Sequence, residues 1–95
     1  MVVLITYDVN TTSKAGEKRL RTVSKICNSY GFRVQNSVFE CDVDNAQFIT
    51  LKNLLLKAMD QSVDSIRIYQ IGHNKTNIEH FGVKKNFDVG DVLII

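Results

Sequence analysis

Apolar segments typical of β-strands alternate along this chain with segments that repeat at helical spacing, and their order constrains the fold more than any other feature. Residues 2–8, "VVLITYD", and residues 64–72, "DSIRIYQIG", are rich in β-branched and aromatic residues, as strands are. A helical repeat, a strand pair and a second helical repeat lie between them, and the apolar run "DVLII" occupies residues 91–95. This β-α-β-β-α-β order with a last strand predicts an α+β, ferredoxin-like βαββαβ fold, with both helices on one face of a mainly antiparallel sheet.

The first helix is expected over residues 14–30. Thr12 or Ser13 would cap its N-terminus, and Gly31 would end it in the manner usual for a C-terminal glycine. The strand pair follows at "FRVQNSVFECDV", residues 32–43, with a bend at Gln35–Asn36.

The second helix is expected to begin at Asp44, where Gln47 completes a capping-box pattern, and to run to about residue 59. A further short strand is expected at residues 78–81. The helical positions predicted to face the core are Leu20, Val23, Cys27, Tyr30, Phe48, Leu51, Leu55, Ala58 and Met59.

The strand segments "VVLI" and "IRIY" are largely apolar at consecutive positions. In an antiparallel sheet with helices on one face, the other face normally meets water and its strands alternate. A single domain of 95 residues has no third layer of its own. The pattern therefore predicts a homodimer through the open sheet face.

The composition is that of an ordinary globular chain, with 44% hydrophobic and 23% charged residues. No apolar stretch approaches the ~18 residues of a membrane span, and no basic segment precedes "VVLI", so neither a membrane anchor nor a signal peptide is expected. Cys27 and Cys41 lack metal-ligand spacing. They are expected to be reduced core residues of a cytoplasmic protein.

Positive charge concentrates in residues 14–33, where six Lys and Arg residues face the single acid Glu17. Lys18, Arg21 and Lys25 would share one face of the first helix, whereas Arg19 would lie off that face and point across the end of the sheet towards Asp8. Such a stripe can follow a phosphate backbone without reading sequence, although a solvated helix face has the same pattern. The candidate nucleic-acid-binding residues are Lys14, Lys18, Arg19, Arg21, Lys25 and Arg33.

Asp8 stands at the end of the first strand, where a hydrophobic run would usually finish on a turn residue. A two-fold axis near the strand ends would bring two copies of Asp8 together, and two close carboxylates need a proton or a cation between them. Oxygen donors without histidine suit Mg²⁺ or Mn²⁺. The alternative is that Asp8 caps backbone amides of the following loop.

Other polar and aromatic positions carry weaker signals. Ser37 and Phe39 alternate along one strand, and Phe39 alone is read as a core or interface residue. His73 and His80 have neither metal-ligand spacing nor a nucleophile partner, so both are read as structural.

Three segments together resemble the CRISPR-associated (Cas) protein two family, the small subunit of the spacer-acquisition machinery. They are "LITYDV", "KRLRTVSKICNSYGFRVQNSVFEC" and "DSIRIYQIG", and the likeness covers nearly the whole chain. The segment "IEHFG", residues 78–82, is similar to members that accompany type I-C systems.

The resemblance implies a ferredoxin-like homodimer in which the C-terminal strand, here about residues 91–95, extends the partner's sheet. Several members are magnesium-dependent nucleases that act on RNA or on double-stranded DNA. The family's metal aspartate matches Asp8, with Tyr7 beside it. Its further functional positions match Arg19, Arg21, Arg33, Ser37 and Phe39. The first loop, "NTTSKAGEK", is longer than in some members, which changes where Arg19 and Arg21 lie relative to Asp8.

Two classes of function follow. The first is a slow, magnesium-dependent endonuclease that acts in spacer acquisition, bridges dimers of the CRISPR integrase (Cas protein one) and binds double-stranded DNA or single-stranded RNA. The second is a scaffold that binds DNA and needs no catalysis. A related stand-alone RNase toxin with the same fold is a third alternative.

Overall fold

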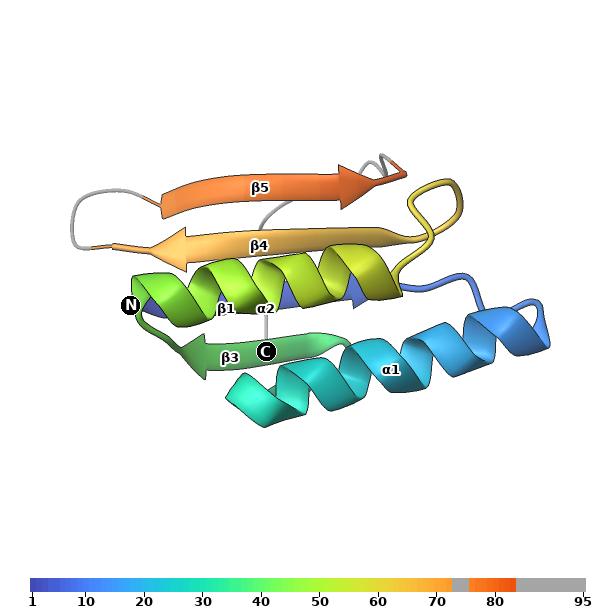
Figure 1. Ribbon diagram of the computed structural model, residues 1–95, viewed down its shortest axis with the longest axis horizontal. Helices are drawn as coiled ribbons and strands as arrows, with labels where there is room; N and C mark the ends of the chain where they lie inside the picture. The colour runs from blue at the N-terminus through green and yellow to red at the C-terminus, as the bar shows by residue number, and fades with distance from the viewer. Residues whose placement is uncertain (73–75, 84–95) are drawn as a thin grey trace.

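The computed structural model describes residues 1–72 and 76–83. Their elements run in the order β1 (Val2–Asp8), α1 (Lys14–Tyr30), β2 (Gly31–Gln35), β3 (Val38–Asp42), α2 (Asn45–Ala58), β4 (Ser65–Ile71) and β5 (Thr76–Gly82) (Figure 1). Every expected element within this range is present. The strand expected at residues 78–81 is longer than predicted, and the expected final strand at residues 91–95 lies outside the described residues.

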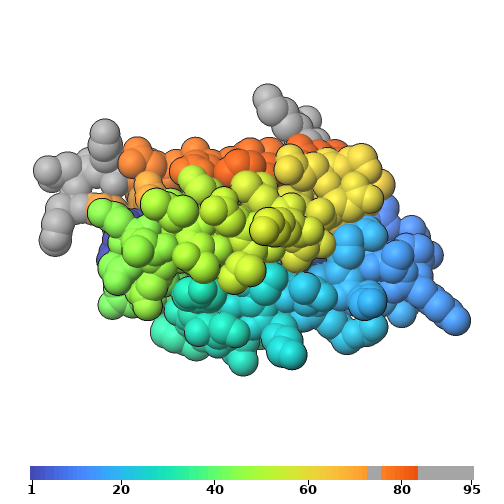
Figure 2. All heavy atoms as spheres, viewed as in Figure 1, coloured from blue at the N-terminus to red at the C-terminus, as the bar shows by residue number. Residues whose placement is uncertain are grey.

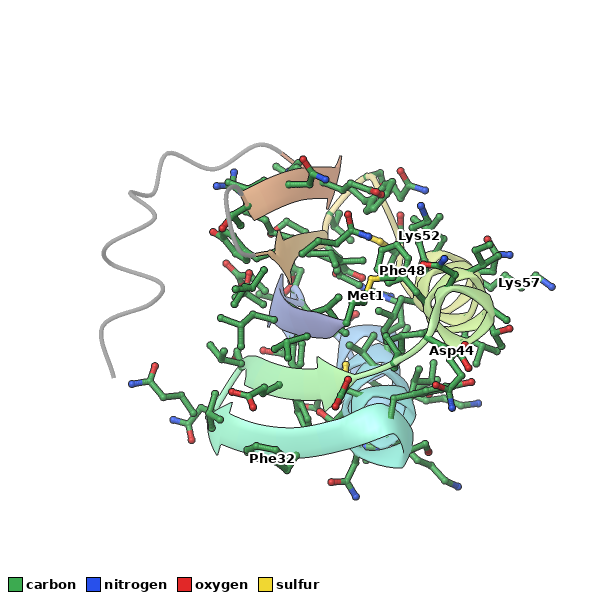
Figure 3. The ribbon with its side chains drawn as sticks, turned by 90° about the vertical axis from the view of Figure 1, so that its left-hand side faces the viewer. Met1, Phe32, Asp44, Phe48, Lys52 and Lys57 are labelled. Atoms are coloured by element: carbon green, nitrogen blue, oxygen red, sulfur yellow. The ribbon has the colours of Figure 1, made fainter. Side chains whose placement is uncertain are left out.

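The strands form one sheet in the order β2-β3-β1-β4-β5, and every neighbouring pair is antiparallel. Both helices lie on one face of this sheet, as the side view shows (Figure 3). This arrangement confirms the α+β, ferredoxin-like fold, with β5 added at the edge beside β4.

Both helix starts follow the predicted capping chemistry. The Ser13 side chain accepts a hydrogen bond from the Gly16 N–H at 3.0 Å, and Asp44 and Gln47 form a complete capping box. Gly16 is needed for packing, because a Cβ at this position would lie 1.9 Å from the Asn10 carbonyl oxygen. Gly31 differs from expectation: its backbone is extended, so it begins β2 directly instead of capping α1 in a left-handed conformation.

The core lies between the helices and the sheet. Figure 2 shows the helix-covered face, where α1 and α2 lie side by side. Phe48 points from α2 towards the sheet, while Lys57 points to solvent (Figure 3). The buried cluster comprises Val3, Ile5, Tyr7, Val9, Val23, Cys27, Phe39, Cys41, Val43, Phe48, Leu51, Leu55, Met59, Ile66 and Ile68.

Cys27 and Cys41 are free thiols in this core, as predicted. Burial raises the pKa of the Cys27 thiol to about 12 and that of Cys41 to about 11. Both side chains therefore act as small apolar groups and not as nucleophiles.

The opposite face of the sheet is covered by neither α1 nor α2 (Figure 3). Strand register aligns Phe32, Glu40, Leu4, Tyr69 and Ile78 in one row across all five strands of this face. Phe32 and Ile78 at the two ends of the row are 57% and 47% exposed. The consecutive apolar positions in β1 and β4 thus serve both faces of the sheet. Neither helix of the described chain has the length and apolar character needed to cross a membrane.

Candidate metal and nucleic-acid sites

Tyr7 and Asp8 are neighbours in sequence but project to opposite faces of the sheet, because side chains alternate along a strand. Tyr7 belongs to the core on the helix side, and its hydroxyl shares a 2.8 Å hydrogen bond with the Ser24 Oγ of α1. Asp8 is exposed at the end of β1, where it pairs with Ser65 of β4. The residues expected to act together are therefore divided between two separate surfaces.

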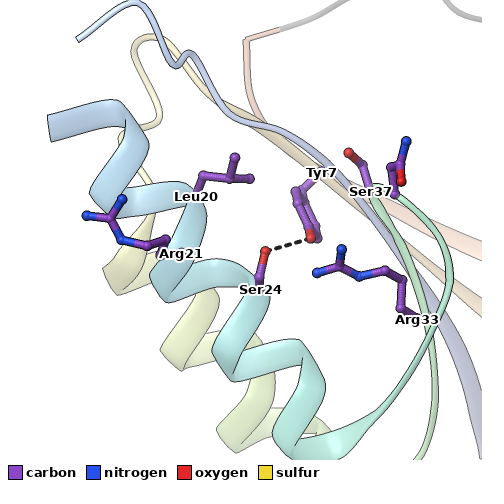
Figure 4. A pocket seen from close by; sticks show the side chains of 7 residues that line it. Tyr7, Leu20, Arg21, Ser24, Arg33 and Ser37 are labelled. Carbon is purple, nitrogen blue, oxygen red and sulfur yellow. Dashed lines mark hydrogen bonds between the residues drawn. The ribbon is translucent and has the colours of Figure 1, made fainter. Parts of the chain in front are cut away.

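On the helix side, a cavity of about 500 Å³ lies between α1 and the β2–β3 hairpin. Figure 4 shows the Arg33 guanidinium extending from the hairpin towards Tyr7 and Ser24, while the Arg21 guanidinium lies on the outer side of α1. The residues that line the cavity are Tyr7, Leu20, Arg21, Ser24, Arg33, Asn36 and Ser37. Four residues predicted from the family resemblance thus share this cavity: Tyr7, Arg21, Arg33 and Ser37.

Phe39 contacts two of the residues that line this cavity, Tyr7 and Arg33. It is fully buried, and its ring stacks against Tyr7 with ring centroids 6.2 Å apart. The Arg33 guanidinium lies over the same ring, 5.3 Å from its centroid, in a cation–π contact. Phe39 is therefore a core residue whose effect on the site passes through Tyr7 and Arg33.

Arg19 does not point towards Asp8, which corrects the expectation from the sequence. Its Nε donates to Asp64 Oδ2 at 2.9 Å, and its Nη2 donates to Asp64 Oδ1 at 3.3 Å. Asp64 lies 45 residues further along the chain, and it binds this guanidinium because a fully buried carboxylate needs a positive partner.

Asp64 was not singled out from the sequence, yet it organises this end of the molecule. Besides Arg19, the backbone N–H groups of Asn10 and Asp60 each donate to its carboxylate at 2.9 Å. Burial by itself would raise the pKa of Asp64, but the Arg19 and backbone hydrogen bonds outweigh it and leave the pKa below its usual value. The carboxylate ties together α1, the loop that follows Asp8, and the loop before β4.

The basic face of α1 is exposed, as predicted. Lys14, Lys18, Arg21 and Lys25 are all exposed along this helix. Their spacing of three or four residues places them in one row on the helix surface. The exposed Arg33 lines the same cavity as Arg21 and so lies beside this row.

Arg67 and His80 lie on the same face of the sheet as Asp8, and the sequence did not predict this. Register places Arg67 and His80 opposite Thr6, two residues before Asp8. His80 Nε2 is 2.9 Å from the Val83 carbonyl, so this nitrogen carries the hydrogen, and Nδ1 accepts from Arg67 Nε at 3.4 Å. This bonding agrees with the structural role expected for His80, whereas His73 lies outside the described residues.

A family model for "CRISPR associated protein Cas2" matches residues 1–78. The chain belongs to the Cas2 family. It is 56% identical over 95 residues to "CRISPR-associated endonuclease Cas2" of Halalkalibacterium halodurans, with 99% of each chain covered. It is 50% identical over 96 residues to "CRISPR-associated endoribonuclease Cas2" of Chlorobaculum tepidum, with both chains covered completely.

The fold is similar to the crystal structure of Streptococcus pyogenes Cas2 at pH 6.5. The TM-score is 0.71 at 57% sequence identity, over 78% of this chain and 89% of that one. The resemblance noted in the sequence is thus confirmed at the level of family and fold.

The Cas2 resemblance implies a divalent metal at Asp8. Whether this chain can hold one depends on the oxygen and nitrogen donors that lie close together. In residues 1–72 and 76–83, no three His, Cys, Asp or Glu side chains gather as a metal-ligand cluster. Asp8 offers an exposed, hard oxygen donor, the type that Mg²⁺ and Mn²⁺ take. Because Mg²⁺ is often held by one or two carboxylates with waters and substrate phosphates, Asp8 fits such an ion as one part of a shared site.

Proposed function

We propose that this chain is a spacer-acquisition subunit with slow, metal-dependent endonuclease capacity on RNA or double-stranded DNA. The observation that carries the proposal is the match to the Cas2 family over residues 1–78, together with the family's candidate metal aspartate, Asp8, exposed at a strand end. Relatives of about half identical sequence bear the names endonuclease and endoribonuclease. Free, buried thiols at Cys27 and Cys41 suit the reducing cytoplasm, where we place its activity. The type I-C subtype stays a prediction.

The proposal includes a homodimer formed through the face of the sheet opposite α1 and α2. Phe32, Ile71 and Ile78 are exposed apolar side chains on this face. Tyr69, which pairs with Leu4 and Ile78 in the row across this face, has a buried hydroxyl without a hydrogen-bond partner in the part of the chain that the structure describes. A second copy on this face would cover the apolar side chains and place two Asp8 carboxylates on one composite surface.

In this scheme the chain's own residues bind and orient the substrate. Asp8 supplies a negative oxygen donor at a position held by the pairing of β1 with β4. The exposed row of Lys14, Lys18, Arg21 and Lys25 binds backbone phosphates. When bound, Mg²⁺ or Mn²⁺ supplies polarisation of the phosphodiester and a coordinated water of lowered pKa.

The test compares cleavage of duplex DNA and single-stranded RNA by the wild type and Asp8→Asn over a magnesium series. Cleavage is expected to fall by about 100-fold or more in Asp8→Asn, which corresponds to about 2.7 kcal/mol of transition-state stabilisation. Asp42→Asn is the matched control, because Asp42 is an exposed aspartate on the same face at the opposite end of the sheet. Full magnesium-dependent activity in Asp8→Asn would exclude this site.

A second candidate function, the non-catalytic scaffold, is favoured by the exposed basic row on α1. In that role the dimer clamps DNA and bridges two integrase dimers, and Asp8 is dispensable. Duplex affinity should then fall steeply with salt even without magnesium, because phosphate contacts release counterions. Charge reversal of Lys18, Arg21 and Lys25 should reduce both the affinity and the salt slope; unchanged binding would remove the basic row from the proposal.

A further inference from the structure

The cavity between α1 and the β2–β3 hairpin cannot serve the Asp8 carboxylate of the same chain. Tyr7 lines the cavity on the face of the sheet that the helices cover, and the next residue, Asp8, projects to the other face. The sheet itself separates the two groups. A phosphate in this cavity is therefore not the phosphate that Asp8 would face, and the cavity needs a role of its own.

The charge of this cavity favours an anion. Arg33 projects into it and Arg21 stands at its rim (Figure 4). Among the ion pairs found in the described residues, none includes either arginine, whereas the nearby Arg19 is paired with Asp64. A guanidinium that is held in place and lacks a carboxylate partner is a preformed binding group for phosphate.

Arg33 is held in place by its contact with the Phe39 ring, 5.3 Å from the guanidinium carbon to the centroid. That contact leaves the N–H edges of the guanidinium for a ligand. The hydroxyls of Ser24, Ser37 and Tyr7 line the same cavity, and the Tyr7–Ser24 pair is a ready 2.8 Å hydrogen-bonded unit. With the Tyr7 hydroxyl donating to Ser24, the hydroxyls of Ser24 and Ser37 can donate to phosphate oxygens beside the guanidinium.

The volume and the apolar lining of the cavity indicate a ligand larger than a phosphate ion. A volume of about 500 Å³ falls in the range of small-molecule sites and exceeds what one phosphate needs. Leu20 and the Tyr7 ring give the cavity an apolar side against which a sugar or base can pack. Asn36 adds an amide with both donor and acceptor groups.

We propose that this cavity binds one nucleotide through its phosphate, with Arg33 and the Ser24 hydroxyl as the main phosphate contacts and Leu20 beside the sugar or base. The nucleotide is either a residue at the end of a nucleic-acid strand or a free nucleotide. The choice of a nucleotide as the ligand class rests on the proposed function, whereas the preference for a phosphate rests on the cavity alone.

The test uses the full chain without magnesium, so that it does not depend on cleavage or on Asp8. Binding of AMP, adenosine and inorganic phosphate is followed by NMR titration of the ¹⁵N-labelled protein. AMP should shift the amide signals of Ser24, Arg33 and Ser37, and adenosine should not. Absence of any AMP-induced shift at these residues would overturn the proposal.

Two variants and two matched controls locate the binding. Arg33→Gln and Ser24→Ala should each weaken AMP binding about tenfold or more. Lys57→Gln removes an exposed cation from α2, and Ser29→Ala removes an exposed hydroxyl from α1; both should change AMP affinity less than twofold. Equal losses in the variants and the controls would overturn the proposal, as would wild-type affinity in Arg33→Gln.

Competition separates the two sources of the nucleotide. A fluorescent duplex with a 5′-phosphate is titrated with AMP, and a duplex with a 5′-hydroxyl serves as the control. Displacement of the phosphorylated duplex by AMP assigns the cavity to the end of a strand. AMP binding that leaves the duplex bound assigns it to a free nucleotide.

Discussion

Asp8 and Asp64 lie at the same end of two paired strands and have opposite environments. Asp8 pairs with Ser65, the residue that follows Asp64. Asp8 is exposed, whereas Asp64 is fully buried and accepts hydrogen bonds from Arg19, Asn10 and Asp60. The contrast shows that residue type and position at a strand end do not tell a buried structural carboxylate from one that is exposed to a ligand; burial and hydrogen bonding in the folded chain do.

The same contrast separates the arginines of α1. Arg19 and Arg21 are two residues apart, so about 200° of helix rotation separates their side chains. Arg19 turns towards Asp64, and Arg21 turns to solvent beside the cavity. A guanidinium that is committed to a buried carboxylate is no longer available to a phosphate. We therefore assign Arg19 to the stability of the fold, whereas Arg21 stays available to the proposed binding surface.

The largest expected effect comes from removing the buried carboxylate. Asp64→Ala leaves a guanidinium and two backbone N–H groups without their acceptor. Loss of one partner of a buried ion pair typically costs about 3–5 kcal/mol. For a domain of this size that lowers the thermal midpoint by about 12 °C or more. Calorimetry would measure the thermal midpoint of Asp64→Ala, with Asp42→Ala, which changes an exposed aspartate, as the control. Equal midpoints of the two variants would contradict the structural role of Asp64.

A smaller loss of stability is expected from Arg19→Gln, because the two backbone donors to Asp64 remain. Arg21→Gln is the matched control on the same helix, and its midpoint should stay close to that of the wild type. Nucleic-acid binding should follow the opposite order, with the greater loss in Arg21→Gln. Urea unfolding and duplex titration of both variants would measure stability and affinity. If folded Arg19→Gln lost as much duplex affinity as Arg21→Gln, the two arginines would not have these separate roles.

The pH dependence of the free energy of unfolding also tests the role of Asp64. The pKa of Asp64 in the folded chain lies below its usual value of 3.8, so the folded state binds this proton less tightly than the unfolded state. The stabilising contribution is therefore fully present above about pH 4 and is lost as pH falls through the folded pKa. Urea unfolding between pH 5 and 2.5 should show a stability gap between the wild type and Asp64→Asn that narrows at low pH. A gap that stays constant would show that ionisation of Asp64 contributes nothing.

The smallest expected effect on stability is that of Asp8→Asn. Exposed surface substitutions usually change the free energy of unfolding by no more than about 0.5 kcal/mol, and the amide keeps the shape of the side chain. Thermal and urea unfolding of the same preparation used for cleavage assays would check it. A clear destabilisation would mean that Asp8 holds the strand end as Asp64 does, and would remove the contrast between them.

Local sequence patterns predicted most of the fold. The Asp44–Gln47 capping box, the Ser13 cap and the helical repeat through Val23 and Cys27 depend on residues three or four apart, and all appear in the structure. Gly31 shows the limit of such rules, because a glycine after a helix has several uses. Here it passes close to the backbone of the neighbouring strand, where a Cβ would lie 2.0 Å from the Glu40 carbonyl oxygen.

By itself, the sequence determined the order of elements, the buried thiols, the exposed basic face of α1 and the family. Each of these follows from spacing along the chain or from motif likeness. Only the tertiary structure decided that Arg19 belongs to Asp64, 45 residues away, and that Tyr7 and Asp8 serve opposite faces of one sheet. The physical reason is that a buried carboxylate pairs with a positive side chain that folding brings close in space, and a local sequence pattern does not specify which residue that is.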